Sequence, residues 1–383
     1  PQPFFTPRGT PLSVYYRSLV MAEMGVEIDL LTYGEGRDVD VPGIRILRGP
    51  RFRLLGDVPV GPSLLKAWLD LFLFGRAATL LARHDYDFVH AHEEAAFMCL
   101  ALCPAAGVPF VYDMHSSLPQ QLVNFEFTQS RVLRRAFETL EDRALRRAKA
   151  VVTISPALAR YAEARVPDGG ASHHLIENSL VEPVRLADGD TADEAPTEVP
   201  LPEGRPVVAY IGTFEAYQGL DLLLPALEIV ARERPDAFFL LAGGSPRQVE
   251  ERRQRARELG LGDDCLFTGT VPRATARSLA ERATLLTSPR SKGTNTPLKI
   301  YEAMALGTPL VATRVPSHTQ VLDDDVCFLA DPEPDAFARA VLDALGDPDR
   351  RRAVARAARE QYARAYGRDT YRDKVASLLE GLH

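Results

Sequence analysis

The sequence predicts an α/β protein with two domains, each built on a mostly parallel β-sheet. Short apolar runs typical of buried strands alternate with amphipathic helical stretches along almost all of the 383 residues. Buried strands separated by helices of this length indicate right-handed crossovers and parallel pairing. The alternation stops in the acidic, proline-rich segment 182–206, which has too few large apolar side chains to form a core. We therefore predict a linker there, with one domain on either side.

The strands and helices follow in order along the chain. In the first half, strands are predicted near Glu27–Thr32, Ile44–Leu47, Asp87–Ala91, Phe110–Asp113, Ala150–Ile154 and His174–Ile176, and helices near Ser13–Met24, Leu64–Arg83, Arg131–Ala148 and Pro156–Glu163. After the linker, strands near Val207–Ile211, Ala237–Ala242, Cys265–Phe267 and Leu310–Ala312 accompany helices near Gly219–Arg232 and Gln248–Leu259, and helical sequence from Asp335 to Leu382.

These elements give predicted domain bounds and a place for a ligand. The N-terminal domain covers residues 1–181 and the C-terminal domain residues 207–365. Residues 366–383 are expected to form a helix that packs back on the N-terminal domain. Because ligands of such folds bind outside the carboxyl ends of parallel strands, we expect the site in a cleft shared by the two domains.

Charge and motifs exclude several classes of function. The 45 Lys and Arg residues against 52 Asp and Glu give a net charge of −7, so nucleic acid is not expected as a partner. An anionic ligand must therefore be held by local groups. The sequence contains no Gly-x-Ser-x-Gly, no Walker loop, no zinc-ligand spacing and no complete Gly-x-Gly-x-x-Gly. These absences argue against a serine hydrolase, a P-loop enzyme and a dinucleotide oxidoreductase.

The cysteines and the longest apolar run bear on location. The four cysteines have no spacing that suggests a metal site or a disulfide framework, so we expect buried thiols in a reducing, cytoplasmic setting. The apolar run Leu64–Leu81 is interrupted by Lys66, Asp70 and Arg76, which makes it too polar and too short to span a membrane. We predict an ordinary helix there.

The segment Ser288–Thr313 carries the strongest functional signal. Thr296 before Pro297 is typical of a capped helix start, and Gly307 is typical of a helix end, so a helix is predicted over Pro297–Leu306. Lys299 falls in its first turn, beside the positive end of the helix dipole, where a cation is unfavourable. An anion bound at this terminus, where free backbone N–H groups point, would explain the lysine. The alternative is a solvated lysine on a surface helix.

This segment also resembles a known family. The run Gly293-Thr294-Asn295-Thr296-Pro297-Leu298-Lys299-Ile300-Tyr301-Glu302-Ala303-Met304-Ala305, followed by Gly307 and Pro309, resembles the nucleotide-sugar signature of glycosyltransferase family 4. The resemblance implies the GT-B fold, in which two Rossmann-like domains have parallel sheets that face each other across a cleft. It further implies a retaining, metal-independent transfer of a hexose from a UDP- or GDP-linked sugar to an acceptor hydroxyl, with no cofactor. The C-terminal domain would hold the nucleotide-sugar and the N-terminal domain the acceptor.

The resemblance implies a role for individual residues. His115, at the carboxyl end of the strand Phe110–Asp113, would lie near the transferred sugar, and Lys299 would neutralise the diphosphate. Glu302 would hold the ribose hydroxyls. The remaining expected contacts to the nucleotide-sugar come mainly from loop backbone, at Gly9, Thr10, Gly212, Val271, Asn295 and Thr296, together with the side chain of Arg290. In the family a strand precedes the loop that contains Gly9; none is predicted from Pro1 onward, so we expect that this first strand is missing.

The chain departs from the family pattern at three positions. Thr294 stands where many members carry a second Glu, and Phe214 and Gln218 stand where members often carry Arg and Lys. Stabilisation of the leaving diphosphate is the main electrostatic task of such enzymes, so Lys299 and Arg290 would have to supply the missing charge. Asn178, just before the linker, is expected to be a turn residue or a ligand contact.

Several alternatives remain open at this point. A UDP-sugar 2-epimerase of the same architecture and a non-catalytic nucleotide-sugar binding protein both fit the motifs. The acceptor could be a glycan, a glycolipid or a small molecule. The basic stretch Arg48–Arg53, followed by the helix Leu64–Leu81, would suit docking on the inner face of an anionic membrane. The alternative is an ordinary domain helix that packs inward.

Overall fold

The chain forms two compact units, which we describe separately. The computed structural model describes residues 2–5, 9–50, 64–119, 130–166, 170–184, 186 and 197–382. Contacts between residues assign Pro1–Asn178, Arg185–Gly189 and Tyr371–His383 to unit 1, and Ser179–Val184 and Asp190–Thr370 to unit 2. The last helix of the chain therefore belongs to the same unit as the first half of the sequence.

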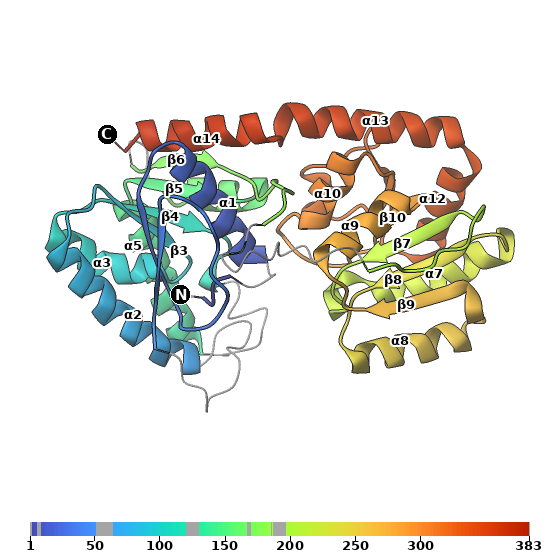
Figure 1. Ribbon diagram of the computed structural model, residues 1–383, viewed down its shortest axis with the longest axis horizontal. Helices are drawn as coiled ribbons and strands as arrows, with labels where there is room; N and C mark the ends of the chain where they lie inside the picture. The colour runs from blue at the N-terminus through green and yellow to red at the C-terminus, as the bar shows by residue number, and fades with distance from the viewer. Residues whose placement is uncertain are drawn as a thin grey trace. The chain divides into compact units, whose positions relative to one another are not determined.

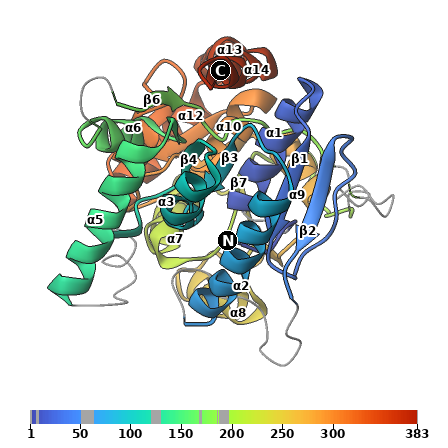
Figure 2. The ribbon, with the colours of Figure 1, turned by 90° about the vertical axis from the view of Figure 1, so that its left-hand side faces the viewer.

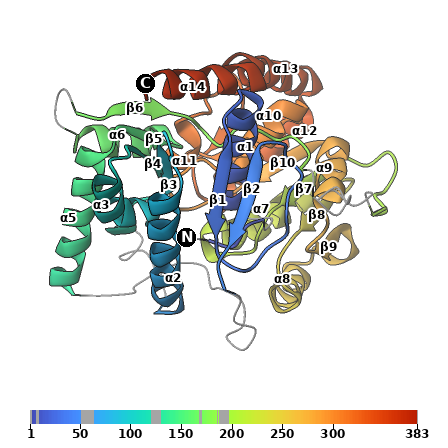
Figure 3. The same cartoon turned by 60° about the vertical axis from the view of Figure 1, so that its left-hand side comes forward.

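Unit 1 contains a parallel sheet and a separate parallel strand pair. In the described part of this unit the sheet has the strand order β3-β4-β5-β6, and β1 pairs with β2; Figure 3 shows β1 and β2 side by side. Helix α3 packs on β3 and β4 (Figure 2). Helix α6 packs on β5 and β6. The elements are α1 (Gly9–Glu23), β1 (Ile28–Thr32), β2 (Ile44–Arg48), α2 (Leu64–Arg83), β3 (Val89–His92), α3 (Ala95–Ala106), β4 (Phe110–Met114), α5 (Arg131–Arg147), β5 (Ala150–Thr153), α6 (Pro156–Glu163) and β6 (Ser172–Leu175), together with α14 (Arg368–Glu380) from the end of the chain.

Unit 2 contains a six-stranded parallel sheet with the order β12-β11-β10-β7-β8-β9. Figure 1 shows β7, β8 and β9 side by side, with α8 next to β9. Strands β7 and β10 are adjacent, and the chain adds further strands outward from them in opposite directions along the sheet. Ligands of open parallel sheets bind beyond the carboxyl ends of the two strands at which the order reverses. The elements are β7 (Val207–Ile211), α7 (Leu220–Glu233), β8 (Phe238–Ala242), α8 (Pro246–Glu258), β9 (Cys265–Gly269), α9 (Arg273–Arg282), β10 (Leu285–Ser288), α10 (Leu298–Leu306), β11 (Leu310–Thr313), α11 (Pro316–Thr319), β12 (Phe328–Ala330), α12 (Pro334–Gly346) and α13 (Pro348–Ala365).

The central strands are apolar because both faces of each sheet are covered. Every residue of β4, β5 and β8 is buried, as expected for parallel strands between helical layers. Helix starts follow from local chemistry. At the start of α8 the Ser245 hydroxyl accepts a hydrogen bond from the Gln248 backbone, and the Gln248 side chain accepts one from Ser245 in return.

Two glycines let the ends of β7 and β8 approach each other closely. A Cβ on Gly243 would lie 1.9 Å from the carbonyl oxygen of Gly212, and the two residues have φ angles of +131° and +154°. A Cβ on Gly243 would collide with the end of β7, and the positive φ angles favour glycine at both positions.

The structure confirms most predicted elements and corrects three helix starts or lengths. Helix α1 begins at Gly9, four residues before the predicted start at Ser13. Helix α10 begins at Leu298, and Pro297 rather than Thr296 is the capping residue, because Pro297 has an extended ψ of 138°. The predicted helical stretch Asp335–Leu382 consists of the three helices α12, α13 and α14. Sequence analysis gave no bounds for α3, α9, β10 and β12.

The predicted linker and cysteines can be followed in part. Of segment 182–206, residue 185 and residues 187–196 lie outside the described residues, and the backbone N–H of Thr197 donates to the Thr275 hydroxyl at 2.8 Å. All four cysteines are buried and free.

Helix α2 combines a buried face with an exposed apolar ridge. Leu69 and Leu73 are buried, whereas the side chains of Trp68, Leu71 and Phe72 are 44%, 66% and 41% exposed. No helix in the described part of the chain is long and apolar enough to cross a membrane. Residues 51–53, which belong to the basic stretch that precedes α2, lie outside the described residues.

Candidate functional site

In unit 2, the buried amine of Lys299 marks the candidate nucleotide-sugar site. Lys299 lies in the first turn of α10, and although its stem is partly exposed, its Nζ atom is buried and has no hydrogen-bond partner among the described residues. Nζ lies 4.1 Å from the centre of the Tyr210 ring and 2.8 Å from the position that a Cβ on Gly212 would take. The predicted residues Lys299 and Gly212 therefore meet at the carboxyl end of β7.

Arg290, which follows β10, lies close enough to influence this amine. Its guanidinium stacks 5.1 Å from the centre of the Tyr217 ring, and its Nη1 donates to the carbonyl oxygen of Asn295 at 2.8 Å. Burial and, to a smaller extent, the charge of Arg290 lower the pKa of Lys299 to about 7, while Glu302 opposes this shift. Two partly desolvated cations that form no close ion pair with a described residue favour binding of a negatively charged group.

The loop before α10 is held by hydrogen bonds from the following helix segment. The Nε2 of Gln320 donates to the Thr296 hydroxyl at 2.8 Å and to the carbonyl oxygen of Thr294 at 2.9 Å. The Thr313 hydroxyl donates to the carbonyl oxygen of Arg290 at 2.5 Å. Thr296, which was expected to cap α10, thus anchors the loop instead.

Glu302 lies one turn after Lys299 on α10 and beside a cavity. Its Oε1 lies 3.7 Å from Nη2 of Arg273, at the start of α9. Lys299 and Glu302 line a cavity of about 120 Å³ together with Arg273, Arg277 and Thr287, and its apolar lining includes Leu286 and Leu306. Because the contact to Arg273 is 3.7 Å long, the Glu302 carboxylate retains the capacity to accept hydrogen bonds from two vicinal hydroxyls.

Two of the three departures from the family pattern, Phe214 and Gln218, have a structural explanation. Phe214 is buried and packs edge-on against Phe267, with the ring centres 6.4 Å apart, so a cation at this position would lie in the core. Gln218 is buried, and its Nε2 donates to the Thr213 hydroxyl at 3.3 Å. Val271 is partly buried at the edge of the core under α10.

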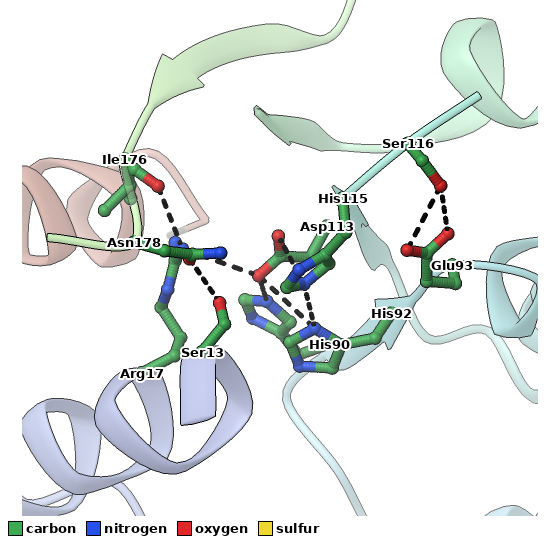
Figure 4. Close-up of polar contacts among 10 residues, drawn as sticks. All are labelled: Ser13, Arg17, His90, His92, Glu93, Asp113, His115, Ser116, Ile176 and Asn178. Carbon is green, nitrogen blue, oxygen red and sulfur yellow. Dashed lines mark hydrogen bonds and ion pairs between the residues drawn. The ribbon is translucent and has the colours of Figure 1, made fainter. Parts of the chain in front are cut away.

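In unit 1, the predicted residue His115 belongs to a buried cluster centred on Asp113 (Figure 4). The Asp113 carboxylate lies 2.8 Å from His90 Nε2, 3.5 Å from His92 Nδ1, 3.4 Å from His115 Nε2 and 3.7 Å from Arg17 Nη2. His92 Nδ1 and His115 Nε2 lie 3.1 Å apart. Strand register explains the cluster: His90 and His92 share one face of β3, and His92 pairs with Asp113 on β4.

Burial controls the protonation of this cluster. Burial lowers the pKa of His115 to about 4 and holds that of His92 well below its ordinary value. Burial alone would raise the pKa of Asp113, but Arg17 and the histidines outweigh it, so this pKa lies well below its usual range. At neutral pH the cluster therefore contains an ionised Asp113, the Arg17 guanidinium and neutral imidazoles at His92 and His115.

We assign the cluster to hydrogen bonding and not to a metal. His90, His92 and Asp113 could each offer one atom to a cation, since these atoms lie within 4.8 Å of one another. Arg17 already balances the carboxylate charge, and a divalent cation beside a buried guanidinium would be strongly disfavoured.

Glu93 is a second functional candidate at the same sheet edge. It follows β3 directly and has a φ of 53°, unusual for a residue other than glycine. The Ser116 hydroxyl donates to its carboxylate at 2.9 Å (Figure 4). Burial, followed by repulsion from Glu94, raises the pKa of Glu93 to about 8.

Two other predicted features of unit 1 lie close to the start of α1. Gly9 and Thr10 form its first turn, and residues 6–8 lie outside the described residues. The Ser13 hydroxyl on α1 donates a hydrogen bond to Asn178 at 2.5 Å (Figure 4). This bond connects α1 to the end of the segment Pro1–Asn178 of unit 1.

Comparison with known proteins decides the family. A family model of group 1 glycosyl transferases matches residues 191–361, and a model of a glycosyl transferase 4-like domain matches residues 15–174. The chain belongs to the group 1, family 4-like glycosyltransferases. It is therefore a glycosyltransferase that uses nucleotide sugars. Residues 175–190, between the two matches, overlap the first part of the predicted linker 182–206.

Individual relatives of this glycosyltransferase differ in acceptor. It is 28% identical to a 2-deoxystreptamine N-acetyl-D-glucosaminyltransferase of Streptomyces fradiae, over 97% of this chain and 90% of the relative. It is 26% identical to a phosphatidyl-myo-inositol mannosyltransferase of Mycobacterium leprae, over 90% and 84%.

Solved structures support the GT-B fold. A sucrose-phosphate synthase of Thermosynechococcus elongatus aligns with a TM-score of 0.74 and 20% identity, covering 100% of this chain and 95% of the other. Anabaena HepE in complex with UDP and glucose aligns with a TM-score of 0.68 and 18% identity, covering 98% of each chain. The family confirms the fold and the enzyme class expected from the segment Gly293–Pro309.

Sequence analysis missed four residues of the unit 1 cluster: Arg17, His90, His92 and Asp113. A signal was present, because His-x-His on one strand and Asp-x-His on the next place four polar side chains on one sheet face. Arg17 could not be found in this way, because its partner is almost one hundred residues away.

Proposed function

We propose that this glycosyltransferase moves a hexose from a UDP- or GDP-linked sugar to an acceptor hydroxyl, with retention of configuration and without a metal ion. The observation that supports this proposal is the buried, unpaired Nζ of Lys299 next to Arg290. The negative charge of a diphosphate would restore the pKa of Lys299 to its ordinary range. The two cations would take the role that a metal ion has in other glycosyltransferases.

In the proposed reaction, the bond between C1 of the sugar and the diphosphate oxygen breaks with oxocarbenium character. Lys299 and Arg290 stabilise the charge that develops on the leaving oxygen. The acceptor hydroxyl attacks C1 from the same face and transfers its proton to the departing phosphate. Glu302 holds the ribose hydroxyls, and backbone groups at Asn295, Thr296, Gly9 and Thr10 contact the sugar and the diphosphate. Backbone at Val271 contacts the base.

His115 is proposed to orient the transferred sugar and the acceptor. Because its pKa is about 4, the imidazole is neutral at physiological pH and can both donate and accept a hydrogen bond. A neutral imidazole suits the contact with sugar hydroxyls, since it adds no charge that would oppose the oxocarbenium ion.

We further propose that the acceptor is a cyclitol, free or lipid-linked. The names of the two relatives above specify 2-deoxystreptamine and phosphatidyl-myo-inositol as their acceptors. Both contain a six-membered carbocycle with several equatorial polar groups. A shared acceptor ring is the simplest explanation of this likeness across two different biological contexts.

One assay tests these proposals together. The protein is incubated with UDP-N-acetylglucosamine, UDP-glucose or GDP-mannose, with and without 2-deoxystreptamine or myo-inositol, in the presence of EDTA. We expect release of nucleoside diphosphate that depends on the cyclitol, and an α-linked product by NMR. Isomerisation of the sugar without an acceptor would instead support a 2-epimerase, and a β-linked product would contradict retention. Loss of turnover in EDTA that added metal restores would contradict metal independence.

Lipid-linked acceptors would require contact with a membrane surface. The exposed side chains of Trp68, Leu71 and Phe72 on α2 favour a peripheral position at the inner, anionic face. The test is sedimentation with vesicles that contain anionic phosphatidylglycerol. Binding that is lost in Leu71→Ser would support docking, and absence of binding by the wild-type protein would contradict it. The Arg51→Ala/Arg53→Ala double variant tests the basic stretch in the same assay.

A further inference from the structure

We propose that Asp113 is the positioning residue for His115 and that Arg17 balances the charge of this pair. The inference rests on the proposed function, because it assigns a partner to the histidine that is expected to contact the sugar. It extends that function to two residues, one on β4 and one on α1, that neither motif nor resemblance singled out.

The first support is the place of Asp113 at the centre of the cluster. Its carboxylate is fully buried and meets side chains from three elements: Arg17 from α1, His90 and His92 from β3, and His115 directly after its own strand. The carboxylate accepts a hydrogen bond from His90 at Oδ2. Its Oδ1 has no hydrogen-bond partner among the described residues and faces His115 Nε2 at 3.4 Å, so its charge acts on His115 through space and favours a proton on that nitrogen.

The second support is that Arg17 is itself fixed. It is fully buried, its Nη2 donates to the carbonyl oxygen of Ile176 at 3.2 Å, and its guanidinium lies 5.5 Å from the centre of the Tyr371 ring on α14. The position of Asp113 therefore depends on segments from both ends of unit 1.

The charges around His115 predict opposite effects of the two residues. The Asp113 carboxylate raises the pKa of His115, and Arg17 and His90 lower it, while burial has the largest lowering effect. His92 is neutral, and Glu177 acts on Arg17. Removal of the Arg17 charge should therefore raise the pKa of His115, whereas removal of the Asp113 charge should lower it.

The experiment compares Asp113→Asn, Arg17→Gln and the double variant, with Leu145→Ala as a control for lost stability in the core of the same unit. Each single variant leaves one buried charge unmatched and is expected to lower Tm. The double variant restores charge balance and should regain much of this loss. It keeps the proposal testable if the single variants fold poorly.

Two readouts separate a positioning role from a structural one. In Asp113→Asn and in the double variant, kcat should fall on the order of 100-fold because the imidazole loses the carboxylate that orients it, while KM for the nucleotide-sugar changes little. In ¹⁵N-histidine NMR spectra recorded over a range of pH, the midpoint of the His115 titration should move to higher pH in Arg17→Gln and to lower pH in Asp113→Asn. Leu145→Ala should lower Tm without changing either readout.

The outcomes distinguish this inference from the proposed function. Wild-type kcat in the double variant, or a His115 midpoint that neither substitution moves, would overturn the positioning role. If both NMR shifts occur but His115→Ala retains full turnover, the network exists and the proposed role of His115 is wrong. The NMR titration needs no substrate, so it remains decisive even if the acceptor is not a cyclitol.

Discussion

The Nζ atom of Lys299 lies 4.1 Å from the centre of the Tyr210 ring and makes no hydrogen bond to any described residue. Attraction between the cation and the ring replaces only part of the hydration that burial removes. The amine is therefore left with a lowered pKa and free donor capacity at the carboxyl end of β7. The first three predictions concern this amine and its neighbours.

Replacement of Lys299 should mainly affect turnover. We expect kcat of Lys299→Ala to fall by about 100- to 1000-fold, because a charge contact to the leaving group is worth about 3 to 4 kcal/mol in the transition state. Steady-state release of nucleoside diphosphate measures the effect. Lys292→Ala is the matched control and should retain activity, because Lys292 is exposed in the loop between β10 and α10. Near-wild-type turnover in Lys299→Ala would contradict the proposed site.

The same lysine predicts a dependence of stability on pH. Its folded pKa of about 7 lies below its ordinary value of 10.5. Between these values the unfolded chain binds more protons than the folded one, so the contribution of Lys299 to the free energy of unfolding should rise with pH. Lys299→Met lacks this contribution. Urea unfolding at pH 7 and pH 9 without ligand should therefore show a smaller rise, or a larger fall, in Lys299→Met than in wild type.

Gly212→Ala should disturb the amine without removing it. The added Cβ would lie 2.8 Å from Lys299 Nζ and 3.2 Å from the Tyr210 hydroxyl, so the lysine must move. We expect the Kd for the nucleoside diphosphate to rise about tenfold, equivalent to 1.4 kcal/mol, as measured by calorimetry. Gly346→Ala is the control, because no atom lies within 4 Å of its added Cβ. Equal affinities of the two variants would show that the position of the amine does not matter.

Glu302→Gln should weaken binding more than turnover. The amide keeps the shape of the carboxylate but loses the charge that favours two hydrogen bonds from ribose hydroxyls. We expect about a tenfold higher Kd for the nucleotide-sugar and a kcat within a few-fold of wild type at saturation. Glu251→Gln serves as the control, since Glu251 forms an exposed pair with Arg247 at 2.8 Å on α8. Unchanged affinity of Glu302→Gln would argue against the ribose contact.

The C-terminal helix should matter for the stability of unit 1. Tyr371 is buried, and its ring lies 5.5 Å from the Arg17 guanidinium. Tyr371→Ala should lower the free energy of unfolding by about 3 kcal/mol or more, as for other large buried side chains. Denaturant unfolding measures this loss, and Arg372→Ala, at an exposed neighbouring position, should be nearly neutral. A Tyr371→Ala protein as stable as wild type would show that α14 adds little to this unit.

Local sequence patterns predicted the strands and helices well where burial is uniform along the chain. Strand β7 keeps its predicted bounds because it is almost uniformly buried, and helix α6 keeps its bounds because its Ser155 cap and its buried face follow from the local sequence. The start of α10 was wrong by one residue, because the ψ angle of Pro297 and the contact from Gln320 to Thr296 depend on the neighbouring loop. A capping pattern alone cannot reveal that another segment competes for the capping side chain.

The sequence by itself determined the two-domain α/β organisation and the resemblance to a family of glycosyltransferases, and it pointed to Lys299, Glu302 and His115 as candidate site residues. These conclusions follow from patterns within short segments, which fix local structure. Only the tertiary structure revealed that Lys299 is desolvated against Tyr210 and that Asp113 joins Arg17 to three histidines. Both depend on which segments meet after folding, and burial then shifts each pKa by removing water.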